Sequence, residues 1–318
     1  MSSRKTKTHA ATTTNSAEGG AASSGRSTVY DIITERICAQ LEKGTVPWLK
    51  PWKGGDLGAP KNLVSGHAYR GVNVFLLSAV GFSSPYWMTF RQASERGGVV
   101  RRGEHGFPVV FWKWLPKRET NDAGDEVTKQ IPILRYYTVF NAEQVSGIEV
   151  PAQPVESTTF NCIERCDQVV QGMPQAPSIT HNEGRAFYRP STDTVSLPRP
   201  TLFNDPAEYY STLFHELCHA SGHGSRLNRP GISEAHFFAD VDYSKEELVA
   251  EMGAAFLCGH CGIERTTLDN SAAYIGGWLK KLRDDKRLVV TAAAQGQKAS
   301  DFILGRKAEQ AEIAAEAV

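Results

Sequence analysis

The chain has 318 residues, which is enough for about two domains of ordinary size. Its 35 basic residues balance 35 acidic residues, so net charge alone does not point to a nucleic acid, an anionic membrane or an acidic substrate. No apolar run approaches the roughly 18 residues that a membrane span requires. Because the N-terminus also lacks the apolar block of a secretory signal, we expect a cytoplasmic protein with no membrane partner.

The first part of the chain predicts a disordered tail followed by a mixed α/β domain. Residues 1–27 are mostly Ser, Thr, Ala and Gly, which cannot bury enough apolar surface to fold. From Val29, apolar residues recur at helical spacing as far as Gly44, and a second helix is expected to open near Gly71 or Asn73. The segments VVFWKW and LRYYTVFN are rich in β-branched and aromatic residues, and they predict the two strands of a hairpin with a long polar loop.

The second part of the chain predicts a separate α+β domain. The residues over 151–160 combine Pro, Ser and Thr and are the best linker candidate, which places the two domains at 28–150 and 161–318. A hairpin is expected around a turn at Ser191 to Asp193, where apolar and polar residues alternate. Helical patterns follow at 206–222, 244–259 and 271–289. The predicted fold class is therefore α+β, with two domains.

A metal-binding pattern lies in the segment YYSTLFHELCH at residues 209–219. His215 and His219 are four residues apart, so on a helix they lie one turn apart on the same face and can bind one cation. Glu216 stands beside them, where it can polarise a water molecule on the metal. The pattern predicts a zinc-type site, which would hold Zn²⁺ or another divalent ion such as Mn²⁺ and requires a third protein ligand.

Two glutamates are candidates for that third ligand. Glu247 and Glu251 are four residues apart and share one helical face, so one could bind the metal while the other hydrogen-bonds a ligand histidine. We favour Glu247, which with Ser244 could form a capping box at a helix start in place of the ligand role or together with it. His223 continues the histidine spacing, but the glycines on both sides of it indicate that the helix ends there.

The N-terminal half carries a local excess of positive charge. Between residues 43 and 118 twelve basic residues stand against three acidic ones, and aromatic residues are interleaved with them. Cations that follow the phosphates and aromatic faces that stack on unpaired bases are typical of proteins that bind single-stranded nucleic acid. The alternative is that the tryptophans belong to the core and the charges to an ordinary solvated surface. The candidate DNA-binding residues are Trp48, Lys50, Trp52, Arg70, Asn73, Trp87, Arg91, Arg101 and Arg102.

Several separated motifs resemble a known family and occur in its order. The runs GTVPWLKPW, GHAYRGVNVFLL, YWMTFRQA, VVRRGEHGFPVVFW and YYTVFNAEQV resemble the N-terminal domain of ArdC-type antirestriction proteins, which also occurs in plasmid primases of the TraC type. HELCHASGHGSRLNR, EELVAEMGAAFLCGHCGI and NSAAYIGGWLKKLRDDKRLVVTAAAQGQKASDFIL resemble the zincin-like metallopeptidase domain that follows it. The resemblance extends from Val29 to about Leu304.

The resemblance implies a protein of a mobile element that protects incoming DNA from host restriction. It implies a domain that binds single-stranded DNA, followed by an SprT-like or thermolysin-like metal domain that could act on a host restriction enzyme or another protein. In that reading Glu216 is the general base, and His215, His219 and one of the two glutamates hold the ion. Two alternatives stay open: a protein that acts by occluding DNA and has a purely structural metal domain, and an accessory protein of plasmid replication or conjugation related to the primases.

Overall fold

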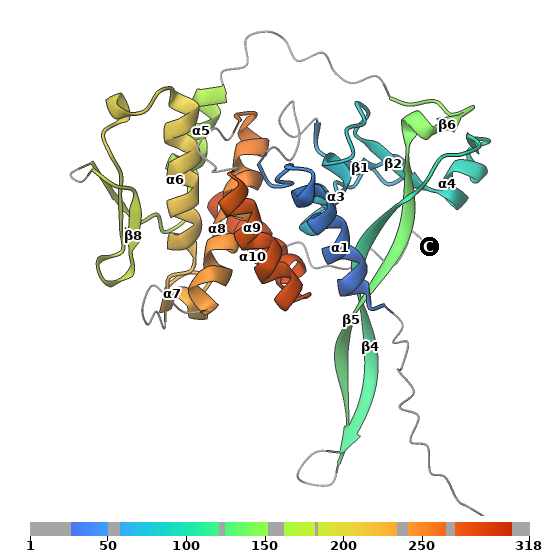
Figure 1. Ribbon diagram of the computed structural model, residues 1–318. Coiled ribbons are helices and arrows are strands. Elements are labelled where there is room, and N and C mark those ends of the chain that lie inside the picture. The colour runs from blue at the N-terminus through green and yellow to red at the C-terminus, as the bar shows by residue number, and fades with distance from the viewer. Residues whose placement is uncertain are drawn as a thin grey trace, which may run out of the picture.

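The computed structural model describes residues 27–49, 58–120, 125–151, 162–181, 184–233, 241–264 and 271–306. The chain forms two α+β domains that lie side by side (Figure 1). The tail expected over 1–27 and the linker expected over 151–160 lie almost entirely outside the described residues, as do Lys50 and Trp52. Of the helices described, none combines the length and the apolar character needed to cross a membrane.

The helix expected to begin at Val29 in the N-terminal half is confirmed. This helix, α1, begins at a capping box in which the Thr28 side chain accepts a hydrogen bond from the Asp31 amide and Asp31 accepts one in return. The elements of this half are α1 (Val29–Glu42), β1 (Lys61–Asn62), α3 (Val72–Ser78), β2 (Tyr86–Thr89), α4 (Phe90–Glu95), β3 (Val99–Val100), β4 (Phe107–Thr120), β5 (Glu126–Asn141), η1 (Ala142–Gln144) and β6 (Val145–Ser146).

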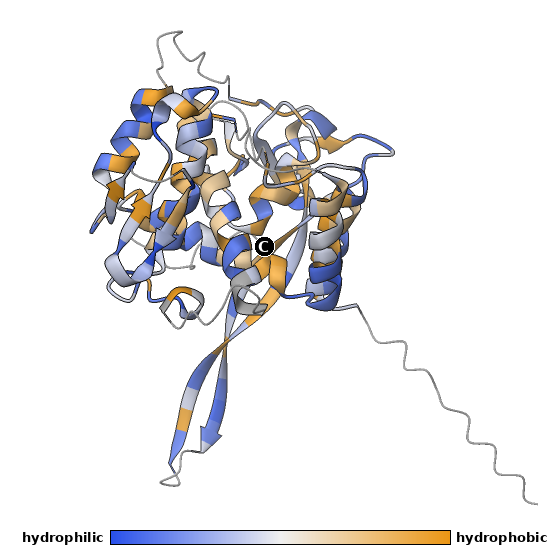
Figure 2. Ribbon diagram, turned by 60° about the vertical axis from the view of Figure 1, so that its left-hand side comes forward, coloured by the Kyte–Doolittle hydropathy of each residue, from blue (hydrophilic) through white to orange (hydrophobic). Residues whose placement is uncertain are grey.

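The main sheet has the strand order β1-β2-β5-β4, with β1 parallel to β2 and the other pairs antiparallel. The expected hairpin is confirmed as β4 and β5, which pair from Phe107 with Val139 to Thr120 with Glu126. The expected long loop is wrong, because most of the residues assigned to it continue the two strands. The outer parts of β4 and β5, toward Thr120 and Glu126, extend beyond the body of the protein (Figure 1). We call the paired residues 113–120 and 126–133 the arm. Most of the arm is hydrophilic (Figure 2), as expected for strands that extend past the core.

The C-terminal half combines a small sheet with a layer of helices. The sheet has the order β7-β9-β8, in which β8 and β9 form the expected antiparallel hairpin and β7 runs parallel to β9. The elements are α5 (Cys162–Gly172), β7 (Ser178–Thr180), β8 (Phe187–Arg189), η2 (Pro190–Thr192), β9 (Thr194–Ser196), η3 (Pro200–Leu202), α6 (Pro206–Ser221), α7 (Pro230–Ser233), α8 (Val241–Cys261), α9 (Ala272–Asp284) and α10 (Leu288–Ile303).

Two of the helix predictions need correction. The single helix expected over 271–289 is two helices, because Asp285 has an extended backbone and its carboxylate accepts a hydrogen bond from the Arg287 amide at 2.9 Å, which ends α9 and starts a new turn. The helix expected to start at Ser244 begins earlier, at Val241. Ser244 therefore lies inside α8, and the capping-box interpretation of Glu247 is wrong.

One hydrophobic core contains residues from both halves of the chain. It contains Ile37 and Phe75 from the N-terminal half together with Phe256 and Val289 from α8 and α10, and the rings of Phe75 and Phe256 stack with their centroids 4.8 Å apart. A second core lies on the other side of α8, against α6. Because α8 is buried on both sides, it connects the N-terminal half to α6.

Close packing of α8 against its neighbours depends on Gly253. A Cβ atom at this position would lie 2.6 Å from the sulfur of Cys218 on α6 and 3.2 Å from the carbonyl oxygen of Gly296 on α10. Only glycine leaves room for helices this close to one another. The position of α8 relative to α6 and α10 is therefore narrowly defined, and the candidate metal site lies between α6 and α8.

Candidate metal centre

Helix α6 presents the two histidines of the motif toward α8. The helix begins at Asp205, whose carboxylate accepts a hydrogen bond from the Glu208 amide at 2.8 Å, with Pro206 in its first turn. Its apolar residues, including Leu213 and Leu217, are buried in the second core. Burial of this stripe sets the rotation of α6, and the histidines then lie on the side that faces α8.

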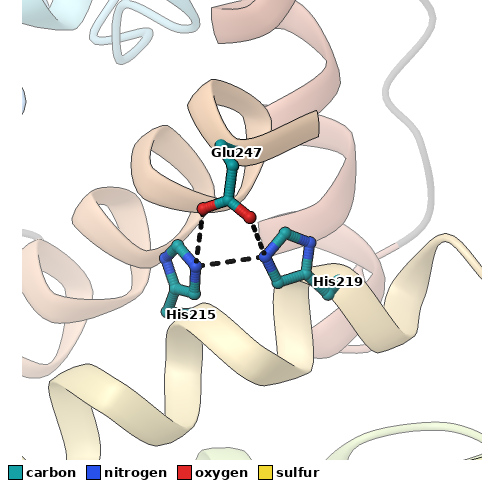
Figure 3. A group of neighbouring side chains, drawn as sticks. All are labelled: His215, His219 and Glu247. Carbon is teal, nitrogen blue, oxygen red and sulfur yellow. Dashed lines mark hydrogen bonds and ion pairs between the residues drawn. The ribbon is translucent and has the colours of Figure 1, made fainter. Parts of the chain in front are cut away.

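The histidines and one glutamate converge on a single point (Figure 3). The Nε2 atoms of His215 and His219 are 3.1 Å apart. The Glu247 carboxylate on α8 lies 3.5 Å from each of them, through Oε2 to His215 and Oε1 to His219. Among the residues that the structure describes, these three form the group of potential metal ligands whose donor atoms lie within 4.8 Å of one another.

The charges of these groups depend strongly on one another. Burial opposes ionisation of Glu247, but hydrogen bonding to His215 and His219 outweighs it and holds the pKa of the carboxyl far below its usual range. Burial would lower the pKa of His219, but Glu246 and Glu247 raise it to about 10. A cation bound between these donors would take the place of the proton.

The donor set fits a divalent cation. Two imidazole nitrogens and one carboxylate oxygen, with a fourth position open to water, are the ligands of many catalytic zinc sites. The His215 and Glu247 side chains keep 21% and 28% of their surface exposed, so the open side is accessible to solvent. Glu216 is 7% exposed and follows directly after the first histidine. This arrangement can hold a cation and place a carboxylate next to a water molecule on it.

A second carboxylate, Glu246, lies behind His219 and was missed by the sequence interpretation. The Nδ1 atom of His219 is buried and has no hydrogen-bond partner within normal range, and Glu246 Oε1 is 3.5 Å from it. Arg229 donates hydrogen bonds to both oxygens of Glu246 at 3.0 and 2.5 Å, and to the Cys218 carbonyl at 2.6 Å. Glu246 can therefore orient His219, while Arg229 connects it to the end of α6. Its position directly before Glu247 was the available signal.

Glu251 has different neighbours from Glu247. Its Oε2 atom accepts a hydrogen bond from Trp48 Nε1 at 2.7 Å and another from the Tyr274 hydroxyl. His223 also lies outside the group of three, and its Nδ1 atom forms a hydrogen bond with the Ser225 hydroxyl at 2.8 Å. The structure thus favours Glu247 over Glu251 and His223 as the third ligand.

Four of the candidate DNA-binding residues make structural contacts within the protein. The rings of Trp48 and Trp87 are 0% and 2% exposed, so neither offers a face to a base, which corrects that interpretation. Asn73 exchanges hydrogen bonds with the backbone of Val110 at 2.7 and 2.8 Å and joins α3 to β4. Arg70 forms an ion pair with Asp301 on α10. Large aromatic side chains stabilise a fold most when they are buried, and Trp48 and Trp87 are part of the hydrophobic core.

The remaining described candidates lie on the surface. Arg91 and Arg101 keep 72% and 52% of their side-chain surface exposed and pair with nearby glutamates, and Arg102 is exposed. Three exposed aromatic residues were not among the candidates: Phe90, Trp114 and Tyr136. Trp114 lies on the arm, and its position in an alternating strand that outruns the core was the signal that could have indicated its exposure.

Comparison with known proteins agrees with both halves of the fold. Residues 27–140 match the family model of the N-terminal domain of the anti-restriction factor ArdC, and residues 164–295 match that of a zincin-like metallopeptidase. The chain is 38% identical over 297 residues to a DNA primase TraC of Escherichia coli. That alignment covers 88% of this chain but only 20% of the primase, so this chain spans about a fifth of that relative.

Two solved structures of the antirestriction protein ArdC from the R388 plasmid are similar over nearly their whole length. The metal-free structure is 39% identical with a TM-score of 0.66, and the similarity covers 86% of this chain and 96% of that one. The Mn(II)-bound structure is 38% identical with a TM-score of 0.69, covering 87% of this chain and 97% of that one. This protein belongs to the ArdC family of antirestriction proteins.

Proposed function

We propose that this protein protects incoming DNA from host restriction and carries a metal-dependent hydrolytic centre of the peptidase type. The observation that carries the proposal is the convergence of His215, His219 and Glu247 on one point. Glu216 directly follows His215 in α6. The Mn(II)-bound relative supports a divalent cation in this centre, and the donor set is equally suited to Zn²⁺.

The residues of the centre have separate roles. His215, His219 and Glu247 would hold the cation, which when bound lowers the pKa of a water molecule and polarises the carbonyl of the scissile bond. Glu216 takes the proton of the attacking water as general base and delivers it to the leaving amine. Glu246 orients His219 from behind, and Arg229 holds Glu246. The substrate would be a protein, for instance a component of the host restriction machinery.

A Glu216→Gln variant tests the hydrolytic role. The substitution keeps the shape of the side chain and removes the base, so we expect cation binding to persist while cleavage of an unfolded test protein falls about 100-fold or more. The matched control is Glu208→Gln, near the start of the same helix, where the side chain accepts a hydrogen bond from Asn204. This variant should cleave the test protein as the wild type does. If wild-type protein with bound cation cleaves no protein, the peptidase proposal fails.

The same variant separates antirestriction by cleavage from antirestriction by occlusion. Plasmid transfer into a restricting host should drop with Glu216→Gln if cleavage is the protective step. Undiminished protection would instead support the alternative that the protein occupies DNA and uses the metal domain as structure. Primer synthesis by the purified protein would support the third reading, an accessory role in plasmid replication, which the relation to TraC motivates.

A second proposed activity is binding of single-stranded DNA by the N-terminal half. The observation that favours it is the proximity in sequence of exposed aromatic rings and exposed cations, Phe90 with Arg91 and Trp114 with Lys113. Stacking and phosphate contacts of this kind tolerate any sequence and prefer unpaired strands. Affinity for an oligonucleotide should therefore fall steeply with salt and exceed the affinity for duplex. Equal affinity for both forms would refute this part.

A further inference from the structure

Trp48, which belongs to the N-terminal half, reaches a carboxylate on the metal-site helix. It lies just after α1, is completely buried, and donates a hydrogen bond from Nε1 to Glu251 Oε2 at 2.7 Å. The hydroxyl of Tyr274 on α9 donates to the same oxygen and lies 3.2 Å from Trp48 Nε1. Both rings pack edge-on against Trp278, each with a centroid separation of 6.2 Å. The N-terminal half, α8 and α9 thus meet at one carboxylate.

The contacts around Glu251 fix the position of its carboxylate. Glu251 is only 8% exposed, and a buried carboxylate is destabilising unless donors replace its lost water. Trp48 and Tyr274 supply such donors. Burial and the nearby charge of Glu251 raise the pKa of Tyr274 well above its usual range, so its hydroxyl keeps its proton and donates at neutral pH. The position of Glu251 therefore depends on both rings.

Glu251 and Glu247 are separated by one turn of an uninterrupted helix. Four residues correspond to about 6 Å along the axis of α8, and the two carboxylates share one helical side. A shift or rotation of α8 that releases Glu251 from Trp48 also moves Glu247 relative to the histidines on α6. The shared core with Phe75 and Phe256 allows few compensating movements.

We infer that Trp48 is a positioning residue of the metal centre, which acts through Glu251 to hold Glu247 at the distance from His215 and His219 that binds a divalent cation. The inference rests on the proposed metal site. It makes the N-terminal half a part of the metal centre, so that the two domains form one thermodynamic unit and cation binding stabilises the segment that carries Trp48.

The direct test is the Trp48→Phe variant of the full chain. Phe keeps an aromatic ring in the core and removes only the N–H donor and part of the volume. We expect the affinity for Mn²⁺ or Zn²⁺, measured by competition with a chromophoric chelator, to fall about tenfold, as happens when support behind a ligand is lost. The matched control is Trp87→Phe, a ring that is equally buried but packs against Phe82 and Phe107. It should lower the melting temperature and leave the cation affinity unchanged.

Further variants separate positioning from stability. Tyr274→Phe removes the second donor from the same oxygen and should weaken cation binding in the same direction, which also covers the case that Trp48→Phe does not fold. Combining Trp48→Phe with Glu251→Ala should weaken binding no more than Glu251→Ala alone, because both act along one path. An unchanged cation affinity in Trp48→Phe or Tyr274→Phe, or additive losses in the double variant, would overturn the inference. Wild-type protein that binds neither cation would instead refute the proposed metal site itself.

Discussion

The metal centre and the exposed surface of the N-terminal half are built in opposite ways. The centre consists of a few buried groups at defined separations, such as Glu246 between Arg229 and His219. The surface consists of exposed rings and cations such as Trp114 and Arg91, which are spread over separate elements. A buried site depends on a few contacts, so the loss of one of them is costly. A surface that binds DNA would divide its binding free energy among many contacts. Substitutions should therefore have large effects at the centre and modest effects on the surface.

The strongest challenge to this contrast is the removal of Arg229. In Arg229→Met the Glu246 carboxylate would remain buried without its ion-pair partner, and we expect the free energy of unfolding to fall by about 3 to 5 kcal/mol. Arg283→Met removes the partner of Glu42 from an exposed pair and should change it by less than about 1 kcal/mol. Chemical denaturation of both variants measures the difference. Equal losses would show that burial is not what separates the two regions.

Removal of a predicted ligand should abolish most of the cation affinity. His219→Ala removes one of three donor atoms, so we expect the affinity for Zn²⁺ or Mn²⁺ to fall more than about 100-fold, beyond the effect of losing an outer contact. His223→Ala is the control, because the His223 ring lies outside the group of three and forms a hydrogen bond with Ser225. Calorimetric titration measures the cation affinity of both variants. A comparable loss of affinity in His223→Ala would indicate that His223 also binds the cation.

A single exposed ring should matter less. Trp114→Ala removes a half-exposed ring from the arm, and we expect the affinity for a single-stranded oligonucleotide to fall about 5- to 10-fold, as for one lost stacking contact. Leu202→Ala, an exposed apolar residue of the C-terminal half, should bind as the wild type does. Fluorescence anisotropy at fixed salt makes the comparison. Full affinity in Trp114→Ala would exclude this ring from the interface.

The smallest expected effect concerns pH. Hydrogen bonding from Arg226 holds the pKa of Asp193 below its usual value against the opposing effect of burial, and Tyr188 also donates to it. Because the unfolded chain takes up this proton at higher pH than the folded one, the ion pair stabilises above the unfolded pKa and is lost as pH falls through the folded pKa. Asp193→Asn should flatten the dependence of the melting temperature on pH below about pH 4, while Asn still suits the left-handed backbone of this position. An unaltered slope would show that another group dominates it.

The contrast between the two regions also explains which predictions from sequence succeeded. Helical spacing correctly placed the two histidines and Glu216 on one helix. Two segments rich in β-branched and aromatic residues correctly predicted the long hairpin, and alternation correctly predicted the short one. The interleaving of basic and aromatic residues led to Trp48 and Trp87 being proposed for a binding surface, and the structure bears out the stated alternative that they belong to the core. Composition records that a ring is large and aromatic, and not whether it is covered. Trp114 has the same chemistry and is exposed, since its strand continues past the core.

The sequence by itself determined the local relations of this protein: a histidine pair one turn apart, a glutamate beside it, and strands of alternating character. Only the tertiary structure decided which glutamate meets the histidines. Glu246, Glu247 and Glu251 share one helix, but they face Arg229, the histidine pair and Trp48 respectively. Trp48 is 203 residues away from Glu251. Periodicity describes neighbours along one helix, whereas these contacts depend on how α6, α8 and the N-terminal half pack together, and no spacing within a segment records that.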